Sequence, residues 1–132
     1  MSNELANNDG KSLVELIHNT GDLVIPKPFE RDIFLFSTFV AGTTHVENIK
    51  ALADELKSDT RLSFFREPDN KYDDKAIVIK TADGQKAGYV PKKDNPVFSR
   101  LMDAGKLLFG KITSLEKKGT WVEIKIDIFL HE

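Results

Sequence analysis

The chain has 132 residues, which is enough for one domain with a hydrophobic core and too few for two domains of ordinary size. Hydrophobic residues make up 40% of the chain and charged residues 30%, as in soluble globular proteins, and no apolar run approaches the roughly 18 residues that span a bilayer. The net charge of −2 argues against nucleic-acid binding by bulk attraction, and the lack of cysteine excludes a disulfide framework, a zinc finger and a thiol nucleophile.

The first predicted element is a short amphipathic helix over residues 9–22, followed by an extended linker, PKPFER. Apolar residues at 13, 14, 16 and 17 form one face of this helix, Asp9 is a candidate cap, and Gly21 ends it. We expect an N-terminal helix and linker at 1–31 and one folded domain at 32–132. The start of the chain lacks the basic region and apolar core of a signal peptide, which favours a cytoplasmic location.

The folded domain begins with a predicted strand and a predicted helix. The aromatic and β-branched stretch at 32–42 predicts a buried strand. Apolar residues at 46, 49, 52, 53 and 56 have the spacing of one helix face and predict a helix over 45–58. A strand at 61–66 follows, and it leads into the segment FFREPDNKYDDKAIVIK at 64–80.

The rest of the domain is predicted to consist mostly of antiparallel strands. Strands at 76–80 and 86–91 are joined by TADGQ, whose Asp-Gly pair favours a hairpin. A helix over 95–105 starts near a proline and ends at Gly105, and the two strands within 106–132 are joined at KKGT. These elements predict an α+β fold, a small, mostly antiparallel, six-stranded β-barrel of the OB or SH3 type with two or three covering helices.

The last predicted strand places one aromatic residue on a polar face. In WVEIKIDIFL the residues at 122, 124, 126, 128 and 130 are apolar, whereas Trp121 shares the other face with Glu123, Lys125 and Asp127. Trp121 either packs over the hairpin end or against a helix, or it forms a platform on which a base or a partner's apolar side chain stacks.

Catalysis by a metal or a phosphate loop is not supported. The acids and lysine in PD and DDK of segment 64–80 are too close together for a metal-dependent nuclease, in which the second acid and the lysine lie on a later strand. Counted from Asp69, the segment also lacks the glycine and the glutamate of an EF-hand loop. The histidines at 18, 45 and 131 lie in distant segments, and there is no glycine-rich phosphate loop. We therefore expect no catalytic residues, no metal and no cofactor.

Basic residues are concentrated in the second half of the chain. Residues 1–60 contain 5 lysines and arginines against 10 acids, whereas residues 61–132 contain 14 against 11. Segment 64–80 lies in the more basic half, which permits a local anionic partner there.

Ordered motifs in this half resemble those of the HIRAN domain family. The motifs are Arg-Glu-Pro at 66–68, Asn-x-Tyr-Asp at 70–73, Ala-Ile at 76–77 and Gly-Tyr-x-Pro at 88–91, with a helix after them. HIRAN domains are found at the front of some eukaryotic DNA-repair helicases and as small standalone bacterial proteins. The match runs from about Phe34 to Phe129, and the chain is similar to the standalone bacterial type.

The resemblance implies an OB-like barrel that, in the repair helicases, captures the 3′-hydroxyl end of single-stranded DNA. Tyr72 matches the tyrosine that stacks on a terminal base, and Asp73 matches the aspartate that accepts a hydrogen bond from the 3′-hydroxyl. Lys92 matches the phosphate-binding basic residue, and Trp121 the aromatic residue of the last strand that lines the pocket. Because a carboxylate repels phosphate and accepts a hydroxyl proton, Asp73 would reject internal backbone or a 3′-phosphate and admit a free end.

The sequence departs from the helicase members at several candidate DNA contacts. Thr38 and Phe39 stand where those members have an arginine followed by an aromatic residue, so one phosphate contact is lost. Lys71 replaces a proline and can restore part of that charge, and Tyr89 occupies a position that varies in the family. Weaker DNA binding, or a different ligand, is compatible with these departures.

Other residues of the motifs have structural explanations. Pro68 shapes the connection, and Asp69 and Asn70 are turn residues whose side chains bond nearby backbone N–H groups. On base rates Lys92 and Lys93 are solvated lysines.

Arg66 and Gly88 are expected to act within the fold. Arg66 lies on the apolar side of its strand and is predicted to be half-buried and paired with Asp73 or Asp74 of the same loop. Gly88 is predicted to allow a close approach of two backbones, and Tyr89 belongs either to the core or to the pocket.

The sequence thus predicts a non-catalytic module that binds single-stranded DNA, prefers a free 3′-hydroxyl end and acts beside a DNA-repair or processing protein. A second hypothesis is a protein-interaction module that receives a peptide in the same aromatic groove. A third is an accessory subunit of a DNA-processing enzyme. No membrane partner is expected, and the sequence does not indicate an oligomeric state.

Overall fold

The computed structural model describes residues 31–132, so the helix predicted at 9–22 and nearly all of the linker lie outside the described residues. Within this range the chain forms six strands, two α-helices and a short 3₁₀ helix. The elements are β1 (Asp32–Phe39), η1 (Thr43–His45), α2 (Ile49–Glu55), β2 (Arg61–Arg66), β3 (Ile77–Lys80), β4 (Lys86–Tyr89), α3 (Asn95–Asp103), β5 (Leu107–Lys118) and β6 (Trp121–His131).

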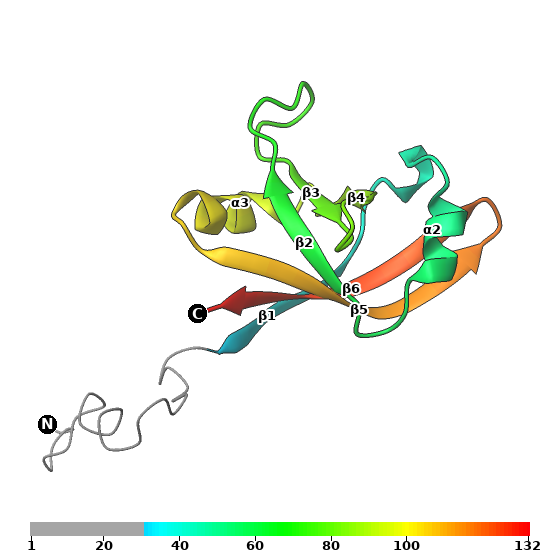
Figure 1. Ribbon diagram of the computed structural model, residues 1–132. Coiled ribbons are helices and arrows are strands. Elements are labelled where there is room, and N and C mark those ends of the chain that lie inside the picture. Colours follow the sequence, from blue (N-terminus) through cyan, green and yellow to red (C-terminus); the bar gives the residue numbers. More distant parts are fainter. Residues whose placement is uncertain (1–30) are drawn as a thin grey trace, which may run out of the picture. The chain divides into compact units, whose positions relative to one another are not determined.

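The six strands form a single antiparallel sheet in the order β1-β6-β5-β2-β3-β4. The sheet curls into a half-barrel, and α2 and α3 lie at opposite ends of it (Figure 1). Bulges between Phe34 and Phe36 in β1 and between Ile112 and Ser114 in β5 interrupt the register, and bulges of this kind bend strands. The predicted six-stranded, mostly antiparallel α+β barrel is therefore confirmed.

A backbone bridge joins the two outer strands and brings the sheet close to a closed barrel. Just after β1, Ala41 exchanges two backbone hydrogen bonds with Tyr89 of β4, at 2.8 and 2.9 Å between nitrogen and oxygen. Gly88 makes this approach possible, because a Cβ there would lie 2.4 Å from the carbonyl oxygen of Ala41 and 2.5 Å from Cγ1 of Val40. The close backbone approach expected at Gly88 is thus the contact that joins β4 to the end of β1.

The core lies on the concave side of the sheet and follows the alternation predicted for the last strand. Four side chains of β6 are fully buried, whereas Leu130 is only partly buried. These four residues are Val122, Ile124, Ile126 and Ile128. They pack with Ile49, Leu52 and Ala53 of α2 and with Phe98 of α3, so each helix covers part of the sheet with its apolar face.

The helix predicted over 45–58 is shorter in the structure. Asn48 has a left-handed backbone conformation with φ 59°, so the α-helix begins only at Ile49, and residues 43–45 form the 3₁₀ turn instead. The predicted apolar face is nevertheless retained, with Val46 and Leu56 packed against the core from outside the helix. Within residues 31–132, neither helix has the length and apolar character needed to cross a membrane.

Candidate nucleic-acid interface

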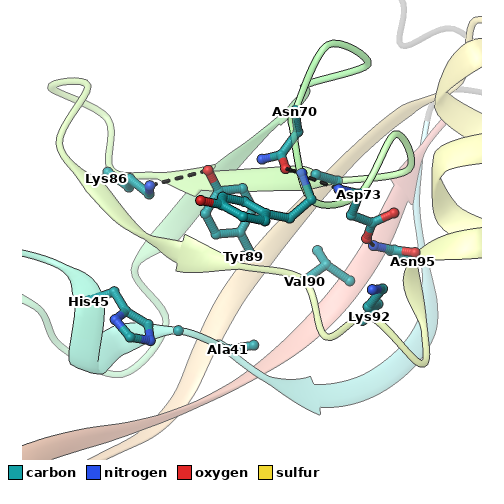
Figure 2. A pocket seen from close by; sticks show the side chains of 12 residues that line it. Ala41, His45, Asn70, Asp73, Lys86, Tyr89, Val90, Lys92 and Asn95 are labelled. Carbon is teal, nitrogen blue, oxygen red and sulfur yellow. Dashed lines mark hydrogen bonds between the residues drawn. The ribbon is translucent and has the colours of Figure 1, made fainter.

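A pocket of about 410 Å³ lies where three distant segments meet (Figure 2). The segments are the turn after β1, the connection between β2 and β3, and the stretch from β4 to the start of α3. Among the side chains that line the pocket are those of Asn70, Tyr72, Asp73, Tyr89, Lys92 and Asn95. The bridge between Ala41 and Tyr89 forms part of the wall, so the pocket depends on the closure of the barrel.

Asn70 shapes the loop that presents Tyr72. Its Oδ1 accepts hydrogen bonds from the backbone N–H groups of Tyr72, at 2.8 Å, and Asp73, at 3.1 Å. This is the Asx-type turn expected of asparagine, and it fixes the direction in which the side chains of Tyr72 and Asp73 leave the backbone. Tyr72 is 89% exposed, so its ring has almost no packing within the chain and is available to stack on a ligand.

Glu67 ties the same loop to β4. One carboxylate oxygen of Glu67 accepts hydrogen bonds from the side-chain amide of Asn70, at 3.0 Å, and from the hydroxyl of Tyr89, at 2.8 Å. The Asn70 amide, the Tyr89 hydroxyl and the charges of Lys86 and Lys80 hold the pKa of Glu67 below its usual value, although burial opposes this shift. The hydroxyl of Tyr89 is therefore anchored, and its half-buried ring forms a wall of the pocket.

The carboxylate of Asp73 accepts hydrogen bonds from two donors and is stabilised by the charges of two lysines. Its Oδ1 accepts the backbone N–H of Lys75 at 2.9 Å, and its Oδ2 accepts the side-chain amide of Asn95 at 2.7 Å. The Asn95 hydrogen bond is the main cause that lowers the pKa of Asp73, with smaller contributions from the Lys75 N–H and the charges of Lys92 and Lys75. Asp73 is thus ionised at neutral pH, and an ionised carboxylate can only accept hydrogen bonds.

The structure brings five of the eight predicted nucleic-acid contacts to this pocket, namely Asn70, Tyr72, Asp73, Tyr89 and Lys92. Lys71 is exposed on the same loop and does not line the pocket. Phe39 is 43% exposed and lines a separate hollow together with Lys125. Lys93, the neighbour of Lys92, lies over the Phe39 ring at 5.7 Å from its centre.

Trp121 does not line the pocket, contrary to the expectation from the family resemblance. It is 39% exposed at the start of β6, opposite Lys118, whose ammonium group lies 5.8 Å from the centre of the indole ring. Strand alternation correctly placed Trp121 on the face opposite Val122. Strand alternation determines the face on which a side chain lies but not which hollow of the surface that face borders, so it could not place Trp121 at this pocket.

Arg66 pairs with a different acid from the two predicted. Its guanidinium forms an ion pair with Asp103 at the end of α3, at 2.9 Å, and donates hydrogen bonds to the backbone carbonyls of Asp74 and Ala76. The predicted partners were the carboxylates of Asp73 and Asp74, but folding brings the last turn of α3 next to the end of β2. The carboxylate of Asp73 therefore remains directed to the pocket.

The family of the chain follows from its match to a known domain. The family model of the HIRAN domain matches residues 33–132. The chain belongs to the HIRAN domain family. No match is found among curated proteins.

Solved structures agree with this family membership. A Lactobacillus plantarum protein of known crystal structure is 28% identical, with a TM-score of 0.73 over 78% of this chain and 98% of that chain. The HIRAN domain of human HLTF has the same fold in its crystal structure, with 16% identity and a TM-score of 0.58 over 75% of this chain and 78% of that chain. Its NMR structure gives a TM-score of 0.50, with 16% identity over 76% of this chain and 80% of that chain.

Sequence reasoning missed several residues of the HIRAN pocket. Asn95, Lys86, His45 and Ala41 all line the pocket, and Glu67 braces its loop. The clearest missed signal is Asn95, a polar residue before Pro96 at the start of a helix, where the sequence pattern indicates only the helix start. Within residues 31–132, no three histidine, cysteine or acidic side chains are grouped so as to hold a metal ion.

Proposed function

We propose that this HIRAN protein is a non-catalytic module that binds single-stranded DNA at its free 3′-hydroxyl end, in DNA repair or processing. The main support is one arrangement in the pocket. An exposed tyrosine, Tyr72, precedes an ionised aspartate, Asp73, whose carboxylate accepts two hydrogen bonds, and Lys92 lines the same pocket and lowers the pKa of Asp73 through its charge. These are the three residues to which the family resemblance assigns a stacking, a hydroxyl-binding and a phosphate-binding role.

Each of the three residues would contact a different part of the strand. The ring of Tyr72 would stack on the terminal base, which contributes about 1–3 kcal/mol and tolerates any base because every base has a flat face. Asp73 would accept a hydrogen bond from the 3′-hydroxyl, and Lys92 would approach the last phosphate. A 3′-phosphate would put negative charge against the carboxylate of Asp73, so the same residue would select against blocked ends.

The first testable prediction concerns Tyr72 and Asp73. Tyr72→Ala should weaken the binding of short single strands about fivefold to 150-fold whatever the 3′ group, because it removes one base-stacking contact. Asp73→Ala should mainly reduce the preference for a 3′-hydroxyl over a 3′-phosphate. Fluorescence anisotropy with matched strands of both kinds measures both effects.

Asp69→Ala is the matched control, since Asp69 is an exposed acid of the same loop that does not line the pocket. Equal affinity of the wild-type protein for the two ends would contradict the proposal. So would the absence of binding at low salt. The second result would instead favour a peptide ligand, for which the apolar side chains of Ala41, Ala76 and Val90 in the pocket are also suited.

A further inference from the structure

Asn95 is a buried polar residue whose amide is directed at Asp73. It is the first residue of α3, it is 2% exposed, and its Nδ2 lies 2.7 Å from Oδ2 of Asp73 (Figure 2). Because an ionised carboxylate only accepts hydrogen bonds, the NH₂ group of the amide, and not its oxygen, must face Asp73. The orientation of the Asn95 amide therefore follows from its partner.

This orientation leaves the other end of the amide without a partner. The Oδ1 of Asn95 is buried and has no hydrogen-bond partner among residues 31–132. A buried acceptor without a partner destabilises a fold, and native proteins contain few of them. Asp73 is partly exposed, so water could replace the amide as its donor. The fold would thus lose little without Asn95, and its presence calls for another explanation.

The two donors to Asp73 explain what Asn95 can do there. The backbone N–H of Lys75 donates to Oδ1 and the Asn95 amide donates to Oδ2, so both oxygens are held and rotation of the carboxylate is restrained. Each carboxylate oxygen can accept more than one hydrogen bond, so acceptor capacity remains on the pocket side. Without Asn95 only the Lys75 N–H would hold the carboxylate, and Asp73 could turn away from the pocket.

We propose that Asn95 is a positioning residue that fixes the Asp73 carboxylate toward the 3′-hydroxyl and thereby sets the selectivity for free 3′ ends. This inference rests on the proposed function of the pocket. Asn95 acts through Asp73 and needs no direct contact with the strand. Asn95 affects the preference for a 3′-hydroxyl over a 3′-phosphate. The part of the affinity that is the same for both kinds of strand depends on Tyr72 and Lys92.

The test is Asn95→Leu, which keeps a similar shape and removes both the donor and the unpaired acceptor. The ratio of affinities for 3′-hydroxyl and 3′-phosphate strands should fall about two- to tenfold. This factor corresponds to the net free energy that one hydrogen bond contributes. The melting temperature should stay the same or rise. Ser99→Ala is the matched control, since Ser99 is also a buried polar residue of α3 but its hydroxyl bonds only the carbonyl of Pro96.

The outcomes separate this inference from the proposed function. If the wild-type protein shows no preference between the two ends, the proposed function fails. If the wild-type protein discriminates and Asn95→Leu keeps the full ratio, the role of Asn95 is refuted while the function stands. An equal loss of affinity for both ends would also refute it, because a purely structural role predicts that result.

If Asn95→Leu does not fold, a second measurement on the wild-type protein tests the positioning role of Asn95. In the wild-type protein, the side-chain amide resonance of Asn95 should shift when a 3′-hydroxyl strand binds, and should shift less with a 3′-phosphate strand. Asp73→Asn should abolish the difference. An Asn95 amide resonance that does not respond to either strand would overturn the inference.

Discussion

At the scale of single residues, each of the two carboxylates at the site accepts a hydrogen bond from an asparagine side-chain amide. Asn70 donates to Glu67 and Asn95 donates to Asp73, and in each case this hydrogen bond is the main cause that lowers the pKa of the acid. The two pairs have different consequences. The Glu67 pair holds the loop to β4 through Tyr89, whereas the Asp73 pair orients an acceptor at the pocket.

A prediction at this scale concerns the pH dependence of stability through Glu67. Because the pKa of Glu67 is lowered in the folded protein, its contribution to stability is present above the pKa of the unfolded chain and is lost as the pH falls through the folded value. Glu67→Gln removes this titration, so the variant should lose less stability than wild type between neutral pH and about pH 3. Chemical denaturation at a series of pH values measures the difference.

Glu47→Gln, at an exposed glutamate outside the pocket, is the control for the substitution itself. If Glu67→Gln and wild type lose stability in parallel, the hydrogen bonds of Glu67 do not favour its charged form.

At the scale of elements, the pocket depends on β4 lying against the end of β1 and on α3 lying next to the loop. Ala41 and Tyr89 provide the first contact through their two backbone hydrogen bonds. The second contact is made by Arg66, which joins Asp103 of α3 to the carbonyls of Asp74 and Ala76. Ala41, Tyr89 and Ala76 line the pocket themselves, whereas Arg66, Asp74 and Asp103 lie outside the lining and help to hold it in place.

Gly88→Ala should therefore destabilise the protein. The added Cβ would meet the Ala41 carbonyl and the Val40 side chain, and such overpacking costs about 1–3 kcal/mol, with more expected here because one neighbour is backbone. Chemical denaturation measures the loss. Since Tyr89 would move with β4, binding of single strands should weaken as well.

Ala82→Ser, in the exposed turn between β3 and β4, is the control for a substitution in the same hairpin. A stability of Gly88→Ala equal to that of wild type would mean that the barrel does not close between Ala41 and Tyr89.

At the scale of the whole molecule, the charge is unfavourable for DNA although the pocket is locally basic. The chain has a net charge of −2, and binding by general attraction to a polyanion would need a large basic surface. Two lysines, Lys86 and Lys92, line the pocket. Recognition of a strand end would consequently rely on a few local contacts and not on the field of the whole protein.

The low net charge and the small number of lysines at the pocket predict that the affinity for single strands depends only weakly on salt concentration. With about two phosphates neutralised, the logarithm of the binding constant should fall with the logarithm of salt concentration with a slope near −1.4, given about −0.7 per phosphate of a single strand. Lys92→Gln should make the slope shallower by about 0.7, because it removes one phosphate contact. Anisotropy titrations at several salt concentrations give both slopes.

Lys57→Gln, at an exposed lysine that does not line the pocket, should leave the slope unchanged. A slope several times steeper in the wild-type protein would indicate an extended basic surface instead of binding at a strand end.

The sequence by itself determined where the strands lie in the chain, the two hairpins, the buried face of β6 and the family. It did not determine the burial of β1, which was predicted to be a buried strand and is an exposed edge strand. The features determined by the sequence depend on residues close together in the chain, such as the alternation from Val122 to Ile128 and the Asp-Gly turn between β3 and β4. Local periodicity and turn chemistry are sufficient to specify such features. The order of the motifs around Tyr72 was sufficient to identify the family.

Only the tertiary structure decided which side chains share the pocket. It brought Asn95 to Asp73 and Asp103 to Arg66, and it left Trp121 outside. The reason is that each of these outcomes depends on the order of the strands in the sheet and on the closure of β4 against the end of β1. Such contacts join residues far apart in the chain, and local sequence patterns contain no information about how distant segments meet.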